Sequence, residues 1–230
     1  MELPGQFFGY YRLWFQGLLW GSLVMRKTEA KRRQIMSAGE GLFAAQRYDE
    51  ITMDAVAQTS GVGKGTIYRY FSSKESLLLA IVDAAREDLL QAVLETSQAP
   101  GDFHSVLVLT CRRIVDFHEQ RHHILHQVFM IGKRLAGKNK GEFQQRWHDD
   151  YMRLLRAFAR VFARGLAEGV MCEGIKAETL AGILLNQLYG WGAMRMHGRT
   201  SELSLEGLVE LFCLGAYRRG TDDVFSRAQS

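Results

Sequence analysis

Apolar side chains recur every three or four residues along most of this chain, which is the spacing of one face of an α-helix. No run of alternating polar and apolar residues predicts a strand, and the 230 residues include only two prolines. We therefore expect an all-α protein that is long enough to bury a substantial core. The amphipathic stretches that predict its longer helices are residues 26–46, 73–96, 103–119, 142–169, 180–194 and 205–217.

A shorter pattern between Ile51 and Glu75 predicts two short helices joined by a tight turn. Thr52 has the side chain of an N-cap, because its hydroxyl can accept a hydrogen bond from a backbone N–H of the first turn. Gly61 follows the first short helix, where glycine supplies the positive φ that ends a helix without a Cβ clash. The second helix places Ile67 on its buried side. This arrangement is typical of a helix-turn-helix.

The exposed side of the second short helix carries short or hydrogen-bonding side chains, as expected for a helix that enters the major groove of DNA. We expect Tyr68 and Lys74 to contact phosphates and Thr66 to contact bases. Ser72 and Glu75 fit a capping box that starts the next helix. The full set of candidate DNA-contacting residues is Thr52, Lys64, Gly65, Thr66, Tyr68, Arg69, Tyr70 and Lys74.

The distribution of charge agrees with this interpretation. Residues 25–75 contain nine lysines and arginines against six aspartates and glutamates. Residues 76–230 contain nineteen against eighteen, so most of the net charge of +4 lies on the helix-turn-helix segment. A positive excess of this kind favours contact with phosphate.

The run TMDAVAQTSGVGKGTIYRYFSSKESLL resembles the DNA-binding signature of the TetR (tetracycline-repressor) family, with a match that extends from Ile35 to Leu78. The resemblance implies a cytoplasmic, ligand-responsive repressor that binds a pseudo-palindromic operator in double-stranded DNA as a homodimer. It implies no enzymatic activity, no cofactor and no metal. Arg47 departs from the pattern, because the family usually carries glycine there. If Arg47 had a positive φ, its side chain would cost about 1 kcal/mol.

The resemblance also implies the division of the chain. Residues 26–72 are expected to form the helix-turn-helix DNA-binding domain, and residues 73–220 a helical ligand-binding and dimerisation domain, followed by a tail over residues 221–230. We expect the effector to be a neutral or weakly charged hydrophobic molecule, since residues 76–230 are nearly balanced in charge. The polar residues expected to orient it, each near an otherwise apolar helix face, are His122, His126, Trp147, Tyr151, Asn186 and Gln187.

The last two predicted helices carry the signal for assembly. Residues 180–194 are apolar nearly all round, and a helix of this kind has no face for water. We expect one face to meet the core and the other to meet the same helix of a second copy. The expected dimer contacts are Ala181, Gly182, Tyr189, Gly190, Ala193, Leu208 and Phe212.

A group of histidines leaves an alternative function open. On one unbroken helix, His118, His122 and His126 would share a face and could ligate a metal, whereas a helix break near Gln120, usual in the family, leaves only the last two stacked. The alternative is therefore a helical metal-binding protein that uses His122 and His126. Three widely spaced cysteines form no Cys-x-x-Cys pair and predict neither a disulfide framework nor a zinc site.

Residues 1–25 differ from the rest of the chain. They contain seven aromatic residues, the last of which is Trp20, and few charged residues. The segment lacks the basic start of a signal peptide, and Arg12 and Gln16 interrupt its apolar run. We treat it as an aromatic N-terminal extension and expect Met25 to be the native start. A membrane-surface arm is the alternative. No stable membrane partner is expected.

Overall fold

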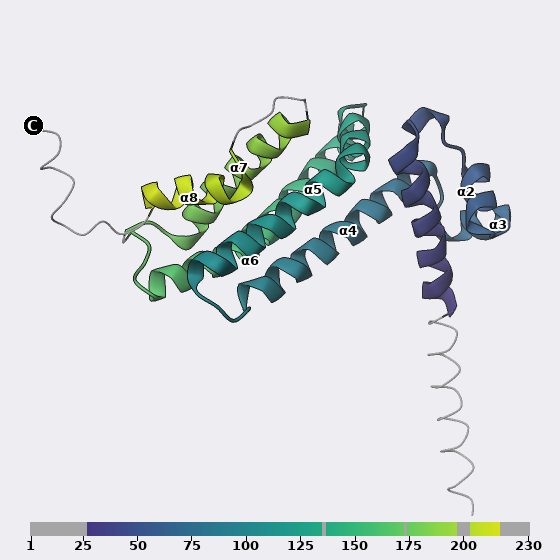
Figure 1. Cartoon of the computed structure of the whole chain (residues 1–230). Helices are drawn as coiled ribbons and strands as arrows, with labels where there is room; N and C mark the ends of the chain where they lie inside the picture. The colour runs from purple at the N-terminus through teal and green to yellow at the C-terminus, as the bar shows by residue number, and fades with distance from the viewer. Residues whose placement is uncertain (1–26, 135–136, 173, 197–202, 217–230) are drawn as a thin grey trace, which may run out of the picture. The chain divides into compact units, whose positions relative to one another are not determined.

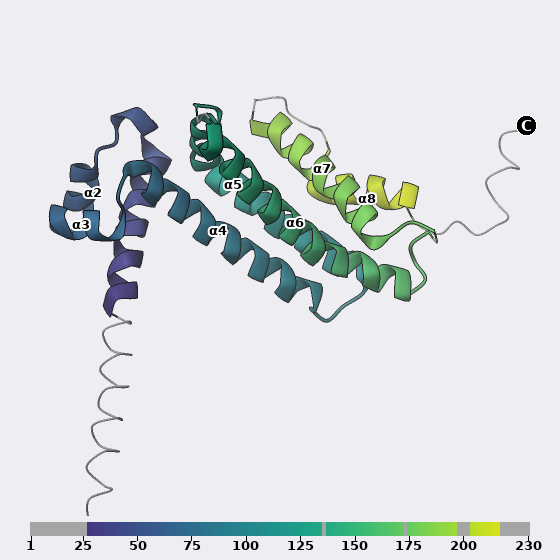
Figure 2. The same ribbon diagram turned by 180° about the vertical axis from the view of Figure 1, so that it is seen from behind.

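The structure is a computed structural model that describes residues 27–134, 137–172, 174–196 and 203–216. Within these ranges the regular structure is helical, which confirms the all-α prediction (Figures 1 and 2). The chain forms two compact units that divide between Ile81 and Val82, inside one helix. The predicted extension over residues 1–25 and the tail over residues 221–230 lie outside the described residues. No helix in the described ranges is long and apolar enough to cross a membrane.

The N-terminal unit begins with a helix over residues 27–45. It continues with the short 3-10 helix η1 (Tyr48–Glu50), α2 (Met53–Ser60), α3 (Lys64–Tyr70) and the start of α4 (Lys74–Ser97). As predicted, the Thr52 hydroxyl accepts a hydrogen bond from the Ala55 N–H at 3.1 Å. Gly61 has a φ of 62° after the end of α2. These two local signals place the turn of the helix-turn-helix as the sequence predicts.

The first two turns of α4 belong to the core of the N-terminal unit. Leu77 is fully buried and Ile81 nearly so. A Cβ built on Gly39 would lie 3.1 Å from a methyl carbon of each of these side chains, so glycine permits the first helix to approach α4 closely. The compact units accordingly divide nine residues after the expected boundary at residue 72.

The structure shows no strain at Arg47 and contradicts the expected capping box of α4. Arg47 has a φ of −69°, so the left-handed strain considered for this position is absent. The capping box of α4 joins Ser73 and Ser76, each of whose backbone N–H groups donates to the other's hydroxyl at 3.1 Å. Glu75 instead lies close to Tyr48, and this neighbour is the main reason why the pKa of the Glu75 carboxyl is lowered.

The C-terminal unit contains the rest of α4, α5 (Phe103–Arg134), α6 (Gly137–Ala167), α7 (Ala177–Met196) and α8 (Leu205–Ala216). Helices α5, α6 and α7 pack against one another, and α8 contacts α5 and α7 (Figures 1 and 2). Aromatic side chains fill the centre, where Phe162 makes edge contacts with Phe103, Phe158 and Phe212 at ring-centroid distances of 5.3–6.1 Å. The unit therefore has a core of its own.

Helix α5 is longer than the sequence predicts. It runs without a break through Gln120, where the family pattern predicted a boundary. Residues 132–134 and 137–141, which lie outside the predicted helices, are helical as well, because α5 extends to Arg134 and α6 begins at Gly137. A Cβ on Gly132 would meet the Phe143 ring at 2.3 Å, so this glycine makes room for an aromatic ring between the two helices.

Candidate functional site

Helix α3 presents its first turn outward. Gly63 is the N-cap, with extended backbone, and Ile67 anchors the helix in the core with no exposed surface. Lys64 and Gly65 are exposed at the N-terminal end, and Tyr68 is 47% exposed although it is a large aromatic residue. Backbone N–H groups at the start of a helix favour anions, so this end of α3 suits a phosphate backbone.

The other candidate DNA-contacting residues surround this turn. Arg69 is exposed and its guanidinium lies 5.5 Å from the centre of the Tyr70 ring. Lys64 forms an exposed ion pair with Asp54 of α2 at 2.8 Å, and this hydrogen-bonded contact raises the pKa of the lysine. Thr66 is half-buried on the same helix. Thr52, Lys64, Tyr68 and Arg69 therefore form an exposed, hydrogen-bonding surface on α2 and α3.

Lys74 lies differently from the expectation of a phosphate contact. Its ammonium donates hydrogen bonds to the carbonyl oxygens of Tyr48 at 2.6 Å and Ile51 at 2.8 Å. It also lies 4.1 Å from the centre of the Tyr48 ring. Lys74 thus joins the start of α4 to η1 inside the unit, a role that no local sequence signal reveals because 23 or more residues separate the partners.

We expect Lys74→Met to destabilise the N-terminal unit by about 1–3 kcal/mol, because two carbonyl groups lose a charged donor. Lys64→Met is the matched control, since its exposed ion pair contributes roughly 0–1 kcal/mol. Urea denaturation followed by circular dichroism measures the change, and hydrogen–deuterium exchange over residues 47–53 localises it. Equal stability of the two variants would contradict this role of Lys74.

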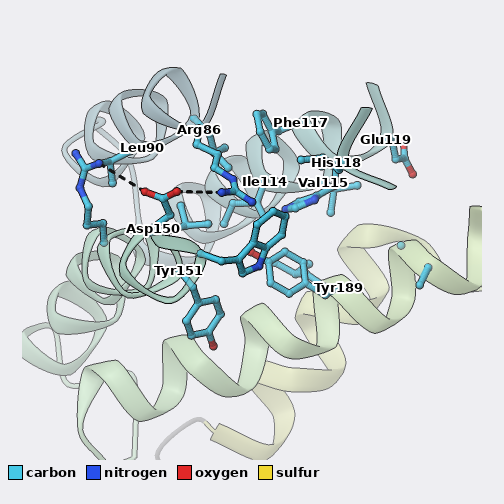
Figure 3. Close-up of a pocket in the computed structure, with 18 of the residues that line it drawn as sticks. Arg86, Leu90, Ile114, Val115, Phe117, His118, Glu119, Asp150, Tyr151 and Tyr189 are labelled. Atoms are coloured by element: carbon cyan, nitrogen blue, oxygen red, sulfur yellow. Dashed lines mark hydrogen bonds and ion pairs between the residues drawn. The ribbon is translucent and has the colours of Figure 1, made fainter. Parts of the chain in front are cut away.

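The C-terminal unit contains a cavity of about 380 Å³ between α4, α5, α6 and α7 (Figure 3). Most of its wall is apolar, from residues such as Leu89, Ile114 and Leu154. Two of the six residues expected to orient an effector, Trp147 and Tyr151, line it. His122, His126, Asn186 and Gln187 do not.

Asn186 and Gln187 are exposed, and the Asn186 amide donates to the Gly182 carbonyl of the preceding turn at 2.9 Å. His126 is exposed as well, with its ring 6.3 Å from that of His122. None of these four side chains is therefore placed to orient a molecule in the cavity. Within the described residues, no group of three or more histidine, cysteine, aspartate or glutamate side chains is arranged to hold a metal ion.

The polar side of the cavity comes from residues that sequence reasoning missed. The Arg86 guanidinium of α4 donates to the Asp150 carboxylate of α6 at 2.9 Å and lies 3.6 Å from the centre of the Trp147 ring. His118 of α5 makes an edge contact with Tyr189 of α7, at 4.7 Å between ring centroids. No periodic signal identifies this cluster, because a single charged residue in an amphipathic helix is normally on its solvated face.

His118 is a buried, neutral histidine. Burial, and secondarily the charge of Arg86, lower the pKa of His118 to about 4 from 6.5. Its Nε2 atom is buried and has no hydrogen-bond partner within the described chain. The unfolded chain therefore binds a proton at a higher pH than the folded one, and folding becomes less favourable as the pH falls from about 6.5 to about 4.

We expect acidification from about pH 7 to about pH 5 to remove about 1–2 kcal/mol of stability through His118. His118→Gln should lack this component, because glutamine does not titrate. Denaturation of both proteins at the two pH values gives the difference directly. A pH dependence that is the same in the variant would show that other groups cause it.

The structure also separates the inner and outer faces of α7 and α8. Ala181, Leu208 and Phe212 of the expected dimer contacts are buried within the protomer, so these side chains cannot reach a partner. Tyr189 and Ala193 line the cavity. The large apolar side chains that are exposed on these helices are Ile183 (46%), Met194 (45%), Leu211 (61%) and Leu214 (65%). Gly190 is exposed between Ile183 and Met194 on α7, and Gly182 is half-buried.

The geometry defines a helix-turn-helix protein with a separate helical unit that encloses a cavity. Residues 35–81 match the family model described as "Bacterial regulatory proteins, tetR family". The HTH-type transcriptional repressor AcnR of Corynebacterium diphtheriae is 27% identical over 192 residues, which cover 82% of this chain and 93% of AcnR. The HTH-type transcriptional regulator SAB2452 of Staphylococcus aureus is 29% identical over 125 residues, covering 53% of this chain and 63% of that protein.

The fold has relatives among solved structures. The complex of SmeT with triclosan superposes with a TM-score of 0.61 at 19% identity, over 83% of this chain and 93% of SmeT. SmeT is the repressor of the multidrug efflux pump SmeDEF of Stenotrophomonas maltophilia. The motif, the family model and the curated relatives together assign the chain: it is a DNA-binding transcriptional regulator of the TetR family.

Proposed function

We propose that the protein is a cytoplasmic repressor that binds a pseudo-palindromic operator as a homodimer and releases it when a small molecule occupies the cavity of the C-terminal unit. The observation that carries this proposal is the continuity of α4, whose first turns lie in the core of the helix-turn-helix unit and whose later turns supply Arg86, Leu89 and Leu90 to the cavity wall. A ligand that contacts these residues acts on the helix whose first turns belong to the DNA-binding unit.

The release of DNA is then a population shift. A ligand moves the equilibrium only if it binds the DNA-incompetent arrangement more tightly than the competent one. AcnR and SmeT are both repressors, and triclosan binds SmeT, which supports a similar regulatory logic in this chain. Metal binding by His122 and His126 has no comparable support, since these side chains lie outside the cavity and form no larger ligand group in the described chain.

The proposed DNA contacts are Thr52 at the N-cap of α2 and five residues of α3, with Tyr70 beside Arg69. The five are the exposed Lys64, Gly65, Tyr68 and Arg69 and the half-buried Thr66. Lys74 is left out, because its ammonium is engaged with two carbonyl groups. The proposed dimer face is the apolar surface of Ile183, Gly190, Met194, Leu211 and Leu214, which is defined here as the α7–α8 face.

Selection of bound duplexes from randomised DNA tests the proposal. We expect two half-sites related by a two-fold axis, bound by two protein chains. The affinity should fall steeply with salt, with a log–log slope of about −0.9 for each phosphate contact. Binding of a single chain, or an affinity that salt does not change, would overturn the dimeric operator model.

A further inference from the structure

The cavity of the C-terminal unit has an unequal supply of hydrogen-bond donors and acceptors. Its carboxylates already have arginine partners: Asp150 accepts from Arg86, and Glu119 pairs with Arg195 at 3.1 Å. Most N–H groups of its central donor, Arg86, make no hydrogen bond within the described chain. Arg86 has five N–H groups and makes one hydrogen bond within the described chain.

Two further polar groups lie beside this guanidinium. His118 Nε2 has no hydrogen-bond partner in the described residues. The Tyr189 side chain contacts the His118 ring, and burial raises the pKa of its hydroxyl, which keeps the hydroxyl a neutral donor. In Figure 3, Arg86, His118 and Tyr189 point toward one region of the cavity. These side chains come from α4, α5 and α7. The Arg86 guanidinium can only donate, the Tyr189 hydroxyl can donate, and the neutral His118 ring donates from Nε2 in one of its two tautomers, so the three groups together can bind an acceptor.

The rest of the cavity wall is apolar and favours a ligand with a hydrophobic body. Leu89, Leu125, Leu154 and Leu188 contribute aliphatic surface, and Phe117 and Trp147 contribute aromatic surface. A cavity of this kind favours a mostly hydrophobic molecule with a few polar atoms that fix its orientation. The donor cluster at one side requires that those atoms accept hydrogen bonds, and an arginine fork matches two carboxylate oxygens in geometry and charge.

We propose that the effector is a small hydrophobic carboxylic acid, bound as its carboxylate to Arg86, with His118 and Tyr189 beside the same oxygens and its hydrocarbon body against the apolar wall. This inference rests on the proposed function, because it names the effector class of the same cavity. It narrows the neutral or weakly charged hydrophobic molecule that the charge balance of the sequence predicts to a singly charged acid.

Asp150 gives the binding a competitive character. Its carboxylate accepts a hydrogen bond from the guanidinium of Arg86 at 2.9 Å. A ligand carboxylate competes with Asp150 for the same donors, and Asp150 retains Arg153 nearby, at 4.0 Å. Since Arg86 lies on α4, the exchange of partners acts directly on the helix that continues into the DNA-binding unit.

A matched set of probes tests the head group. Decanoate, decanol and decyltrimethylammonium have hydrocarbon chains of nearly equal length and differ in the head group, which is an anionic acceptor, a neutral hydroxyl and a cation without donors. Octanoate and dodecanoate vary the chain length. We expect decanoate to bind the full chain about tenfold more tightly than decanol, with decyltrimethylammonium weakest, as judged by calorimetry and by the fluorescence of the cavity tryptophan. Tighter binding of the alcohol or the cation, or no binding of any carboxylate, overturns the inference.

Substitutions identify the residue responsible. Arg86→Met should weaken decanoate binding about tenfold or more and leave decanol binding nearly unchanged. Asp150→Asn should strengthen decanoate binding several-fold, because the carboxylate that competes for Arg86 is gone. The same substitution should weaken the binding of a cationic effector. Arg146→Met, which removes an arginine on α6 that does not line the cavity, is the control and should change neither.

The readouts separate this inference from the proposed function. If Arg86→Met folds poorly, Asp150→Asn still tests the carboxylate assignment. Weaker decanoate binding by Asp150→Asn would contradict competition between Asp150 and the ligand for Arg86. If decanol or decyltrimethylammonium binds best and releases operator DNA, regulation through the cavity stands and only the carboxylate assignment fails. If decanoate binds through Arg86 without releasing DNA, the carboxylate site stands and the ligand-responsive mechanism fails.

Discussion

Gly65→Glu is expected to weaken operator binding by roughly thirtyfold to ten-thousandfold while leaving the fold intact. Each lost contact in a protein–DNA site costs about 1–3 kcal/mol, and a two-fold dimer carries the substitution twice. The new carboxylate would stand on the exposed first turn of α3, at the surface proposed to face phosphates and bases. The negative charge of the glutamate would repel the DNA phosphates, and its side chain would prevent the DNA from approaching α3 closely.

The structure gives a reason why this substitution should not unfold the protein. A Cβ at Gly65 meets no other atom within 4 Å, so the side chain has room. Glutamate is also a better helix former than glycine by roughly 1 kcal/mol, and it is favoured near a helix N-terminus. Loss of DNA binding together with loss of thermal stability would therefore speak against the interpretation.

Gly41→Glu is the matched control for Gly65→Glu. Gly41 is an exposed helical glycine of the same unit, and a Cβ there likewise meets nothing within 4 Å. The two variants have the same net charge, so a general electrostatic effect would appear in both. Fluorescence anisotropy with labelled operator measures the difference. Equal weakening by the two substitutions would show that α3 is not the recognition helix.

The double substitution Leu211→Glu and Leu214→Glu is expected to convert the proposed dimer into monomers. These leucines are the most exposed large apolar side chains of the described residues, at 61% and 65%. Burial of a leucine contributes about 1.5–3 kcal/mol, so losing two leucines from one chain alone costs about 3–6 kcal/mol of dimer stability. This corresponds to roughly a hundredfold to ten-thousandfold weaker association.

Loss of the dimer should also remove most of the operator affinity, because a monomer contacts one half-site only. The fold of each chain should persist, since both leucines are on the surface of the protomer. Leu109→Glu on α5, at a leucine that is 38% exposed, is the control for adding a charge to an apolar surface position. Analytical ultracentrifugation measures the oligomeric state of each variant. If the double variant remains a dimer, the dimer interface does not include Leu211 and Leu214.

The sequence by itself determined the helix-turn-helix. Its signals are local: a threonine hydroxyl that caps the first turn of α2, a glycine with a φ of 62° that ends it, and an isoleucine that anchors α3. Each depends on the backbone within a few residues, so it is readable without the rest of the fold. Apolar spacing likewise predicts helices over residues 73–96, 180–194 and 205–217, close to the observed bounds of α4, α7 and α8.

Only the tertiary structure decided which residues form the cavity and the outer face. Arg86 and Asp150 are 64 residues apart and each is an ordinary charged position in its own helix, so their pairing arises from the packing of α4 on α6. Helix α7 is apolar on all sides, and its pattern therefore cannot say that Ala181 faces inward while Ile183 faces outward. Lys74 reaches carbonyl groups that the chain brings to it from η1. Helical periodicity shows that one face of a helix is apolar. Only the packing of the helices determines whether that face contacts the core, a cavity or solvent.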